Sequence, residues 1–93
     1  MDMESDCRAK IKVIGQVQGV GYRYSTLLMA KNLKLTGYVK NLPDESVYIV
    51  AQGSPDSVRN LIEWCKTGPR RAIVESVEYS FHPVMDLTNF HIR

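Results

Sequence analysis

The sequence predicts an α+β fold in which one sheet carries two helices on the same face. Apolar residues alternate with polar ones along several short runs, which is the period of half-buried strands. In two longer runs they recur at intervals of three and four residues, which is the period of amphipathic helices. The runs follow one another in the order β-α-β-β-α-β. Two right-handed split βαβ units of this kind form a four-stranded antiparallel sheet.

A glycine-containing bend separates the first strand from the first helix. In "RAKIKVIGQV", Ala9, Ile11 and Val13 share one face, and basic residues alternate with them. Residues 15–21 break this regularity with three glycines. A helix is expected over residues 22–34, which contain neither Gly nor Pro. Its core-facing stripe at helical spacing consists of Tyr22, Thr26, Met29, Ala30 and Leu33.

The middle of the chain predicts a β-hairpin. The segments "LTGYVKNL" (residues 35–42) and "SVYIVAQG" (46–53) are rich in residues that favour strands. Between them, "PDE" suits a turn, because Pro43 presets its own φ and Asp44 tolerates turn geometry. The two segments are therefore expected to pair as neighbouring strands.

A second helix is expected over residues 54–68. Ser54 suits the N-cap, Pro55 suits the first turn, and Asp56 complements the positive end of the helix dipole. Gly68 and the proline after it stop the helix. Its apolar stripe consists of Val58, Leu61, Ile62 and Cys65.

The last segments complete the sheet. The run "AIVESVEYSFH" (72–82) alternates again, and "TNFHIR" (88–93) suits a further short strand at the sheet edge. The whole pattern describes a ferredoxin-like α/β sandwich, a fold that hosts many unrelated functions. We expect residues 1–7 to form a flexible N-terminus and residues 8–93 to form one domain.

The composition excludes several classes of protein. Ninety-three residues allow one core, and the two cysteines make no disulfide framework. Twelve Lys and Arg against ten Asp and Glu leave a formal charge of +2, too balanced to indicate nucleic acid or a membrane surface as a partner. No apolar run is long enough to span a bilayer, and no leader peptide is expected. We expect a monomer in the reducing cytoplasm, without a nucleic-acid or membrane partner.

The bend "GQVQGVGYRY" (15–24) has two interpretations. Its glycines can serve only to turn the chain between a strand and a helix. Alternatively, its backbone N–H groups form an anion-binding concavity, to which the N-terminus of the following helix adds donors and positive dipole charge. Arg23 supplies a planar guanidinium for phosphate-like oxygens, and Val17 and Val20 would anchor the loop in the core. The pattern is neither a dinucleotide fingerprint nor a Walker A loop, so a small anion is favoured.

Three segments resemble the acylphosphatase family. "GQVQGVGYR" (15–23) closely resembles its signature G-x-V-Q-G-V-x-F-R. "GYVKNLPDESV" (37–47) and "EWCKTGPRRAIVESVE" (63–78) are similar to two later segments of the family, and the resemblance runs from residue 8 to residue 92. Two departures are small. Tyr22 stands where phenylalanine is commoner, so its hydroxyl needs a partner or solvent, and Gln16 stands where a basic residue is frequent.

The resemblance implies an enzyme that hydrolyses the carboxyl–phosphate bond of acyl phosphates to a carboxylate and phosphate, without a metal or cofactor. It implies that Arg23 holds the phosphoryl oxygens, that Asn41 orients the attacking water, and that the water's proton goes to the substrate's own phosphate. Inorganic phosphate is then both product and inhibitor. From residue type alone, the position of Asn41 before Leu-Pro-Asp favours a role in the turn that follows it, and only the resemblance favours catalysis. The loop amides implied in phosphate binding belong to Gln16, Val17, Gln18, Gly19, Val20 and Gly21.

Other reactive residues suggest different chemistry. "CKTGPRR" (65–71) fits C-x5-R, the loop of cysteine-dependent phosphatases, in which a helix N-terminus stabilises the thiolate. Cys65 instead lies near the C-terminus of the expected second helix, on its apolar stripe, and is expected in the core. His82 and His91 have no second ligand at metal spacing, so no metal site is expected. Trp64 lies off the stripe and is expected to pack at the sheet edge.

Two non-catalytic functions remain open for this fold. RNA-recognition modules share the order of elements and stack bases on exposed sheet aromatics within a basic-aromatic strand motif. No strand here shows that motif, although Tyr38, Tyr48 and Tyr79 lie on expected strands. An anion-binding module would hold phosphate at Arg23 without turnover. Hydrolysis of an acyl phosphate separates the enzyme from both, and salt-sensitive RNA binding favours the first of them.

Overall fold

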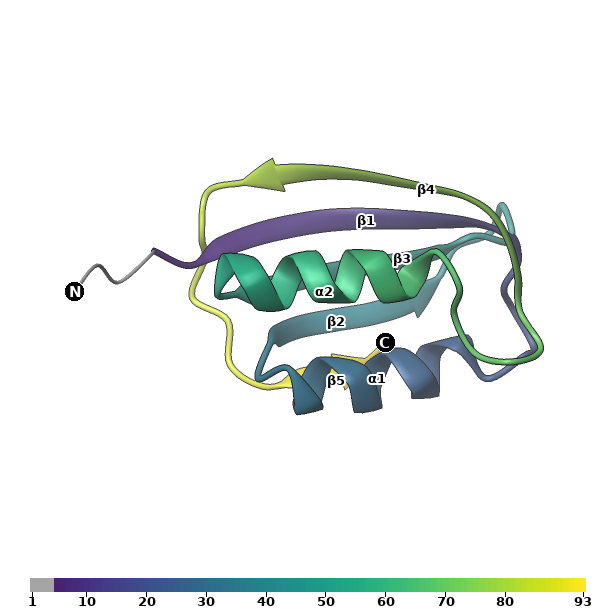
Figure 1. Ribbon diagram of the computed structural model, residues 1–93, viewed down its shortest axis with the longest axis horizontal. Helices are drawn as coiled ribbons and strands as arrows, with labels where there is room; N and C mark the ends of the chain where they lie inside the picture. Colours follow the sequence, from purple (N-terminus) through teal and green to yellow (C-terminus); the bar gives the residue numbers. More distant parts are fainter. Residues whose placement is uncertain (1–4) are drawn as a thin grey trace.

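The computed structural model describes residues 5–93, and it confirms the ferredoxin-like α+β fold and the order of its elements (Figure 1). Of the expected flexible N-terminus, residues 1–4 lie outside the described residues, and Cys7 is the first residue of the first strand. Within residues 5–93, no helix is both long enough and apolar enough to cross a membrane. The elements are β1 (Cys7–Gln16), α1 (Tyr22–Asn32), β2 (Thr36–Asn41), β3 (Val47–Gly53), α2 (Pro55–Cys65), β4 (Ile73–His82) and β5 (Phe90–Ile92).

The sheet has five strands in the order β4-β1-β3-β2-β5, so the short C-terminal strand is confirmed. The first four pair antiparallel, as expected, but β5 pairs parallel with β2, which makes the sheet mixed. The cause is the direction of β4. Because β4 runs antiparallel to β2, a chain that reverses after β4 arrives at the far edge parallel to β2. Residues 83–89 make this crossing from one edge of the sheet to the other.

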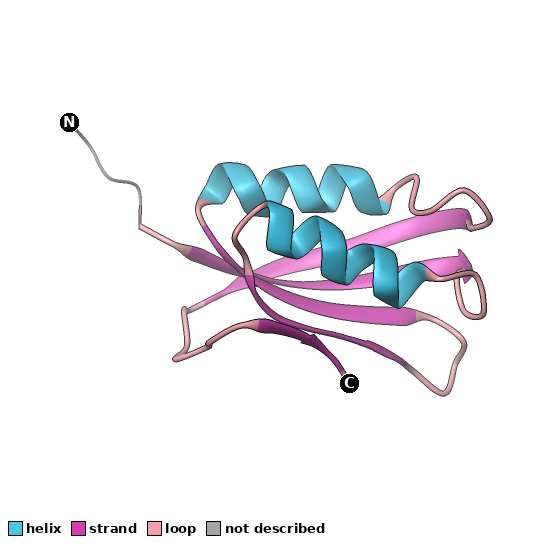
Figure 2. Ribbon diagram, turned by 90° about the horizontal axis from the view of Figure 1, so that it is seen from below, coloured by secondary structure: helices cyan, strands magenta, loops and turns pink. Residues whose placement is uncertain are grey.

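Both helices lie on the same face of the sheet (Figure 2). Ala9, Ile11 and Val13 of β1 face these helices and are fully buried, as their alternation predicts. On α1, the predicted stripe is buried or half-buried along its whole length. The helix ends at Asn32 rather than Lys34, because Lys34 takes a left-handed conformation with φ 61° that turns the chain toward β2.

The second helix begins as its sequence predicts. The Ser54 hydroxyl oxygen accepts a hydrogen bond from the backbone N–H of Ser57 at 3.2 Å, and Pro55 is the first helical residue. The expectation for Trp64 is wrong. Its ring packs against Tyr22 of α1, with centroids 5.4 Å apart, rather than at the sheet edge. One helical position is about 100° of rotation, so a residue next to the stripe at Cys65 turns toward the neighbouring helix.

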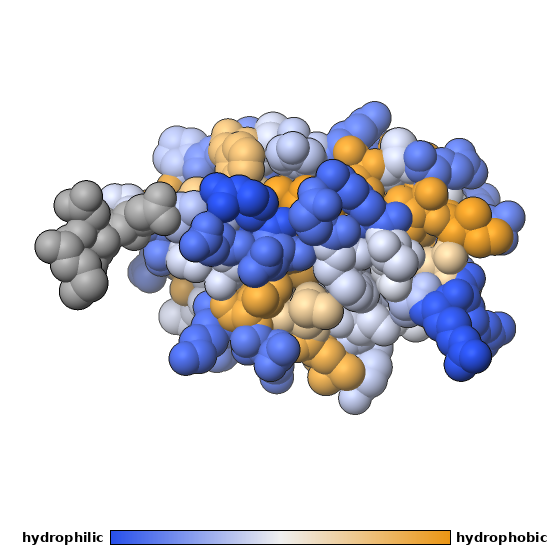
Figure 3. All heavy atoms as spheres, in the orientation of Figure 1, coloured by the Kyte–Doolittle hydropathy of each residue, from blue (hydrophilic) through white to orange (hydrophobic). Residues whose placement is uncertain are grey.

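The helix-bearing face is chemically mixed. Figure 3 shows hydrophilic side chains across this face and hydrophobic ones in separate patches. The apolar core lies underneath, between the helices and the sheet, and includes Ile49 and Leu61.

Candidate active site

The bend after β1 is held in place by the core. On the side of β4, the pairing of β1 shifts register between Ile14 and Gly15, an irregularity that bends a strand and is common beside functional sites. After Gln16 the chain leaves the sheet. Val17 is then 1% exposed, and Val20 packs against the core, so both residues anchor the loop as expected.

The loop presents unpaired backbone donors. Gly19 and Gly21 have φ values of 76° and 81°, in the left-handed region that favours glycine. Gly21 is the N-cap of α1, and no side chain of residues 5–93 caps that end of the helix. Among the described residues, no protein acceptor receives a hydrogen bond from the backbone N–H groups of residues 17–21. Such N–H groups, next to a helix N-terminus, form a concavity suited to an anion.

The side chain of Gln18 ties this loop to the β2–β3 turn. Its amide nitrogen donates hydrogen bonds to the carbonyl oxygens of Leu42 and Ser46, both at 2.9 Å. The sequence indicated only the backbone amide of Gln18. The two acceptors lie 24 and 28 residues further along the chain, so no local pattern reveals these bonds.

Arg23 lies half-buried in the first turn of α1, where no acidic residue accompanies it. Its Nη1 donates a hydrogen bond of 3.3 Å to the main-chain oxygen of Arg93. None of the ion pairs within residues 5–93 includes Arg23. The guanidinium therefore keeps most of its donors for a ligand, at a helix end that already attracts anions.

Asn41 is the last residue of β2, and the turn begins after it. The Leu42 N–H donates to the Ser46 carbonyl, so the interpretation of Asn41 as a turn residue does not describe its place. Its Oδ1 has essentially no solvent exposure and no hydrogen-bond partner among the described residues. Buried polar atoms are nearly always paired, so an unpaired one needs an explanation.

These residues meet in a cavity of about 200 Å³. Arg23 and Asn41, which are 18 positions apart in the sequence, line it together. Of the predicted loop residues, Val17, Gly19 and Gly21 line it, whereas Gln16, Gln18 and Val20 do not. The sequence missed three lining residues, which are Tyr22, Tyr24 and Ile92.

The three missed residues differ in how far the sequence could reveal them. Tyr22 and Tyr24 flank Arg23 in the sequence, so their position beside a predicted site residue could have indicated that they line the cavity. Ile92 arrives on β5, and only the parallel pairing of β5 with β2 brings it near Asn41. None of the residues lining the cavity carries a carboxylate, an imidazole or a thiol.

Tyr22 and Cys65 are structural residues of this region. The Tyr22 hydroxyl donates a hydrogen bond of 2.7 Å to the Cys65 carbonyl oxygen, so the extra hydroxyl has its partner. Burial raises the pKa of Tyr22 above its ordinary value. Cys65 is fully buried, as expected, and burial raises the pKa of its thiol to about 12. A protonated core thiol cannot act as the nucleophile of a cysteine-dependent phosphatase.

The histidines lie apart from this cavity. Nε2 of His82 is hydrogen-bonded to the Ser80 hydroxyl at 2.8 Å, and Nε2 of His91 accepts a bond of 3.4 Å from Arg93. Within residues 5–93, no three His, Cys, Asp or Glu side chains group together as metal ligands would.

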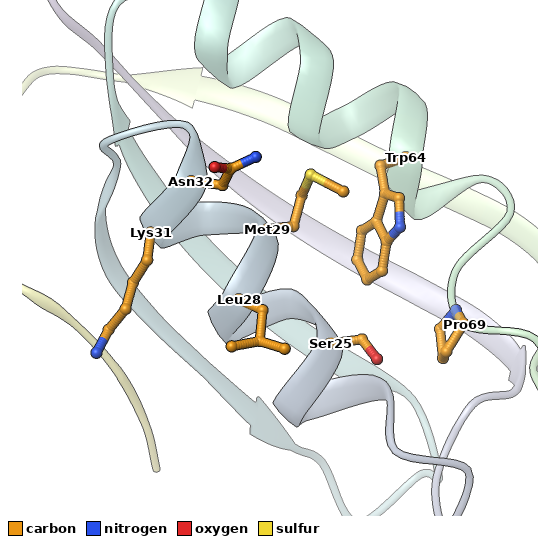
Figure 4. Close-up of a pocket in the computed structure, with 7 residues that line it drawn as sticks. All are labelled: Ser25, Leu28, Met29, Lys31, Asn32, Trp64 and Pro69. Atoms are coloured by element: carbon orange, nitrogen blue, oxygen red, sulfur yellow. The ribbon is translucent and has the colours of Figure 1, made fainter.

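A larger groove of about 620 Å³ lies between α1 and α2 (Figure 4). Met29 of α1 and Trp64 of α2 face each other across it. Lys31 is the one charged residue among those that line it, and neither Arg23 nor Asn41 reaches it. The smaller cavity, which brings Arg23 and the loop glycines together with Asn41, is therefore the better candidate for chemistry.

Several known proteins that are similar to this chain in sequence and structure are described as acylphosphatases. A family model described as Acylphosphatase matches residues 9–92. An acylphosphatase of Caldivirga maquilingensis is 48% identical, covering 98% of this chain and 98% of its own length. An acylphosphatase of Nostoc sp. is 43% identical over 92% of this chain and 85% of its own length. The solved structure of an acylphosphatase from Coxiella burnetii superposes with a TM-score of 0.92, at 40% identity, covering 95% of this chain and 93% of that chain.

Proposed function

This chain belongs to the acylphosphatase family and is a hydrolase of acyl phosphates; we propose that Arg23 and the loop amides bind the phosphoryl group and that Asn41 orients the attacking water. One observation carries this proposal. A single cavity brings the Arg23 guanidinium and the loop glycines to the residue whose buried Oδ1 has no protein partner among the described residues.

The phosphoryl group fits the donor side of this cavity. Its oxygens carry the charge that grows as the bond to the acyl oxygen breaks, and transfer of this kind depends on positioning and charge stabilisation. Val17, Gly19 and Gly21 line this side of the cavity together with Arg23, so the donors of the loop and of the guanidinium are in place before the substrate arrives. Preorganised donors of this type supply a large share of the reduction in the barrier.

Asn41 suits a water molecule on the acceptor side. A neutral side-chain amide can hold a water molecule by accepting one hydrogen bond from it and donating another, which keeps the water oxygen directed toward phosphorus. In the proposed step, the water oxygen forms a bond to phosphorus while the bond from phosphorus to the acyl oxygen breaks. The acyl oxygen leaves with the electron pair as a carboxylate, which is a good leaving group and needs no strong general acid.

The proton of the water goes to a phosphoryl oxygen of the substrate in this mechanism. No carboxylate or imidazole is found among the residues that line the cavity. The phenol of Tyr22 is already bonded to the Cys65 carbonyl, and its raised pKa makes it a poor source of a phenolate base. A substrate oxygen is therefore the proton acceptor closest to the attacking water.

The test is hydrolysis of a simple aryl acyl phosphate with chelator present, comparing the parent with Arg23→Ala and Asn41→Ala. We expect Arg23→Ala to lower kcat/KM by about 100-fold to 1,000-fold, the usual cost of removing one oxyanion donor, and to weaken phosphate inhibition. Asn41→Ala should lower kcat to a similar degree and leave the phosphate inhibition constant near that of the parent, because phosphate does not need the water.

Two exposed residues of α2 give matched controls. Arg59→Ala and Asn60→Ala remove the same side chains far from the cavity and should retain parental kinetics. Normal turnover in Arg23→Ala or Asn41→Ala would contradict the assigned roles. A folded parent that binds phosphate without hydrolysing acyl phosphates would leave an anion-binding module in place of an enzyme.

A further inference from the structure

We propose that the helix-free face of the sheet binds a short single-stranded nucleic acid, with a base stacked on Tyr48 and phosphates held by Lys10 and Lys40. The cavities of this face share no lining residue with the catalytic cavity, although the main-chain oxygen of Arg93 accepts a hydrogen bond from Arg23. It departs from the expectation of no nucleic-acid partner, which rested on the net charge of the whole chain.

Strand register places the proposed residues on one face. Lys12 of β1 pairs with Tyr48 of β3, and Tyr48 pairs in turn with Lys40 of β2. One step along, Lys10 is aligned with Tyr38 through their shared partner on β3. Side chains of directly paired residues point to the same side of a sheet. The alternate residues of β1 form the core, so these side chains point away from the helices. Figure 2 shows that both helices cover the same face of the sheet.

Positive charge is concentrated on this face. Lys12 is paired with Asp44 at 2.8 Å and lies opposite Glu78 in the register with β4. Lys10 and Lys40, by contrast, take part in no ion pair within residues 5–93. Arg93 adds a further cation beside Tyr38. On α2, Asp56 and Glu63 form ion pairs with Arg59 and Lys66. The total charge is therefore nearly balanced although this face of the sheet is basic.

The aromatic residues of the face are surrounded by cations. The rings of Tyr38 and Tyr48 have centroids 6.3 Å apart, and the Lys40 ammonium lies 6.0 Å and 5.7 Å from them. The guanidinium carbon of Arg93 lies 3.7 Å from the Tyr38 centroid and so covers that ring. Tyr48 has the Lys40 ammonium near its ring but no guanidinium stacked on it, so this half-buried ring is the less covered of the two and is the platform proposed for a base. It lines two adjoining cavities of about 340 and 350 Å³, which also share Lys10.

The connection between β4 and β5 closes one end of this face. The Arg8 Nε donates a hydrogen bond of 2.8 Å to the Pro83 carbonyl. The side chain of Gln52 donates to the Met85 carbonyl and accepts from its N–H, at 2.8 and 2.9 Å. The connection between β4 and β5 therefore limits a ligand on this face to the area around Tyr48.

A single-stranded nucleic acid matches the chemistry of that area. It offers flat rings for stacking and a chain of phosphates for unpaired ammonium groups. A duplex keeps its bases stacked on one another and cannot place one on Tyr48. Lys10, Lys40 and Tyr48 come from three different strands, which is why no single strand showed the usual motif.

The test is fluorescence anisotropy of labelled oligouridylate and oligothymidylate of about ten nucleotides, a length within the usual site size. We expect saturable binding that weakens with salt. Its log–log slope should be about −2, since each neutralised phosphate of a single strand contributes about −0.7 and roughly three cations are available. Tyr48→Leu should weaken binding about fivefold or more, the loss of one stacked base. Lys10→Ala should flatten the slope by about 0.7.

Control variants test which face of the sheet binds the oligonucleotide. Phe81→Leu and Lys31→Ala remove exposed groups on the helix-bearing side and should leave oligonucleotide binding unchanged. Tyr48→Phe keeps the ring and should bind like the parent. If Tyr48→Leu does not fold, as judged by circular dichroism, the salt slope of Lys10→Ala still decides the question.

Three results would overturn the proposal. The first is no binding by the folded parent at low salt. The second is binding that Arg23→Ala or inorganic phosphate abolishes while Tyr48→Leu leaves it unchanged, which would place the oligonucleotide in the catalytic cavity. The third is equal binding of a duplex of the same length. RNA and DNA strands bound equally or unequally both support it, since stacking and phosphate contacts are common to both.

Discussion

At the scale of single residues, Tyr22 joins the start of α1 to the end of α2 through one buried hydrogen bond. Tyr22→Phe removes the donor and leaves the buried Cys65 carbonyl without it. We expect the free energy of unfolding to fall by about 1 kcal/mol, the usual contribution of such a bond. Urea unfolding with an unchanged m-value measures this loss. A variant as stable as the parent would show that the carbonyl finds another donor.

At Asn41 we expect the needs of stability and of activity to conflict. Its unpaired Oδ1 is buried, and an unsatisfied buried polar group costs about 1–3 kcal/mol. Asn41→Ala removes that cost, so we expect it to unfold with a free energy equal to or about 1 kcal/mol above that of the parent, despite its loss of turnover. Chemical denaturation of both proteins tests this. A clear loss of stability would mean that Asn41 holds the fold rather than the water.

The residues of the candidate site differ in how much of their role the sequence alone predicts. Arg23 and the glycines are adjacent in the sequence, and a guanidinium beside a glycine-containing loop at a helix N-terminus already indicated a small anion. Asn41 before Leu-Pro-Asp is locally indistinguishable from a turn residue, and only the family resemblance indicated a role in catalysis. Its buried, unpaired oxygen is a consequence of tertiary packing, which no local pattern contains.

At the scale of elements, the β2–β3 turn should respond to pH. The Lys12 ammonium donates to the Asp44 carboxylate, and Ser46 donates to it from its hydroxyl and backbone N–H, so the pKa of Asp44 lies well below its usual range. A lowered folded-state pKa contributes stability above the unfolded-state pKa of about 3.9. That contribution is lost as the pH falls through the folded-state value.

The variant Asp44→Asn isolates this contribution. We expect it to be less stable than the parent at pH 7, with the difference closing as the pH falls below about 4. The difference in stability should be small and should decrease with salt, because the side chains of Lys12 and Asp44 are 37% and 53% exposed. Thermal unfolding of both proteins across pH measures it. A difference that persists in strong acid would point to the turn geometry of Asp44 rather than its charge.

Elements were predictable where a local signal defines them. The second helix has an N-cap, a proline in the first turn and an apolar stripe, and the structure has all three. The first helix is shorter than predicted, since nothing in the sequence marks Lys34 as left-handed. The position of Trp64 depends on which neighbour packs beside α2, and that neighbour is chosen by the tertiary fold.

At the scale of the whole molecule, the direction of β5 follows from topology rather than from its three residues. Its parallel pairing needs the directions of all the other strands, so the sequence predicted a fifth strand without its orientation. The same pairing carries Ile92 to the cavity. The cavity is therefore assembled from the bend after β1, the end of β2 and the last strand, segments that are distant in the sequence and meet only in the folded protein.

A site assembled in this way couples ligand binding to folding. A ligand that binds only the folded chain stabilises it by RT ln(1 + [L]/Kd), about 2.7 kcal/mol when its concentration is 100 times Kd. Inorganic phosphate should therefore raise the Tm of the parent by several degrees, relative to chloride at equal ionic strength. Asn41→Ala should retain this shift, because phosphate is held by the loop and the guanidinium, whereas Arg23→Ala should lose most of it. Equal shifts in the parent and Arg23→Ala would place phosphate elsewhere on the protein, and the basic sheet face around Tyr48 would be the first place to look.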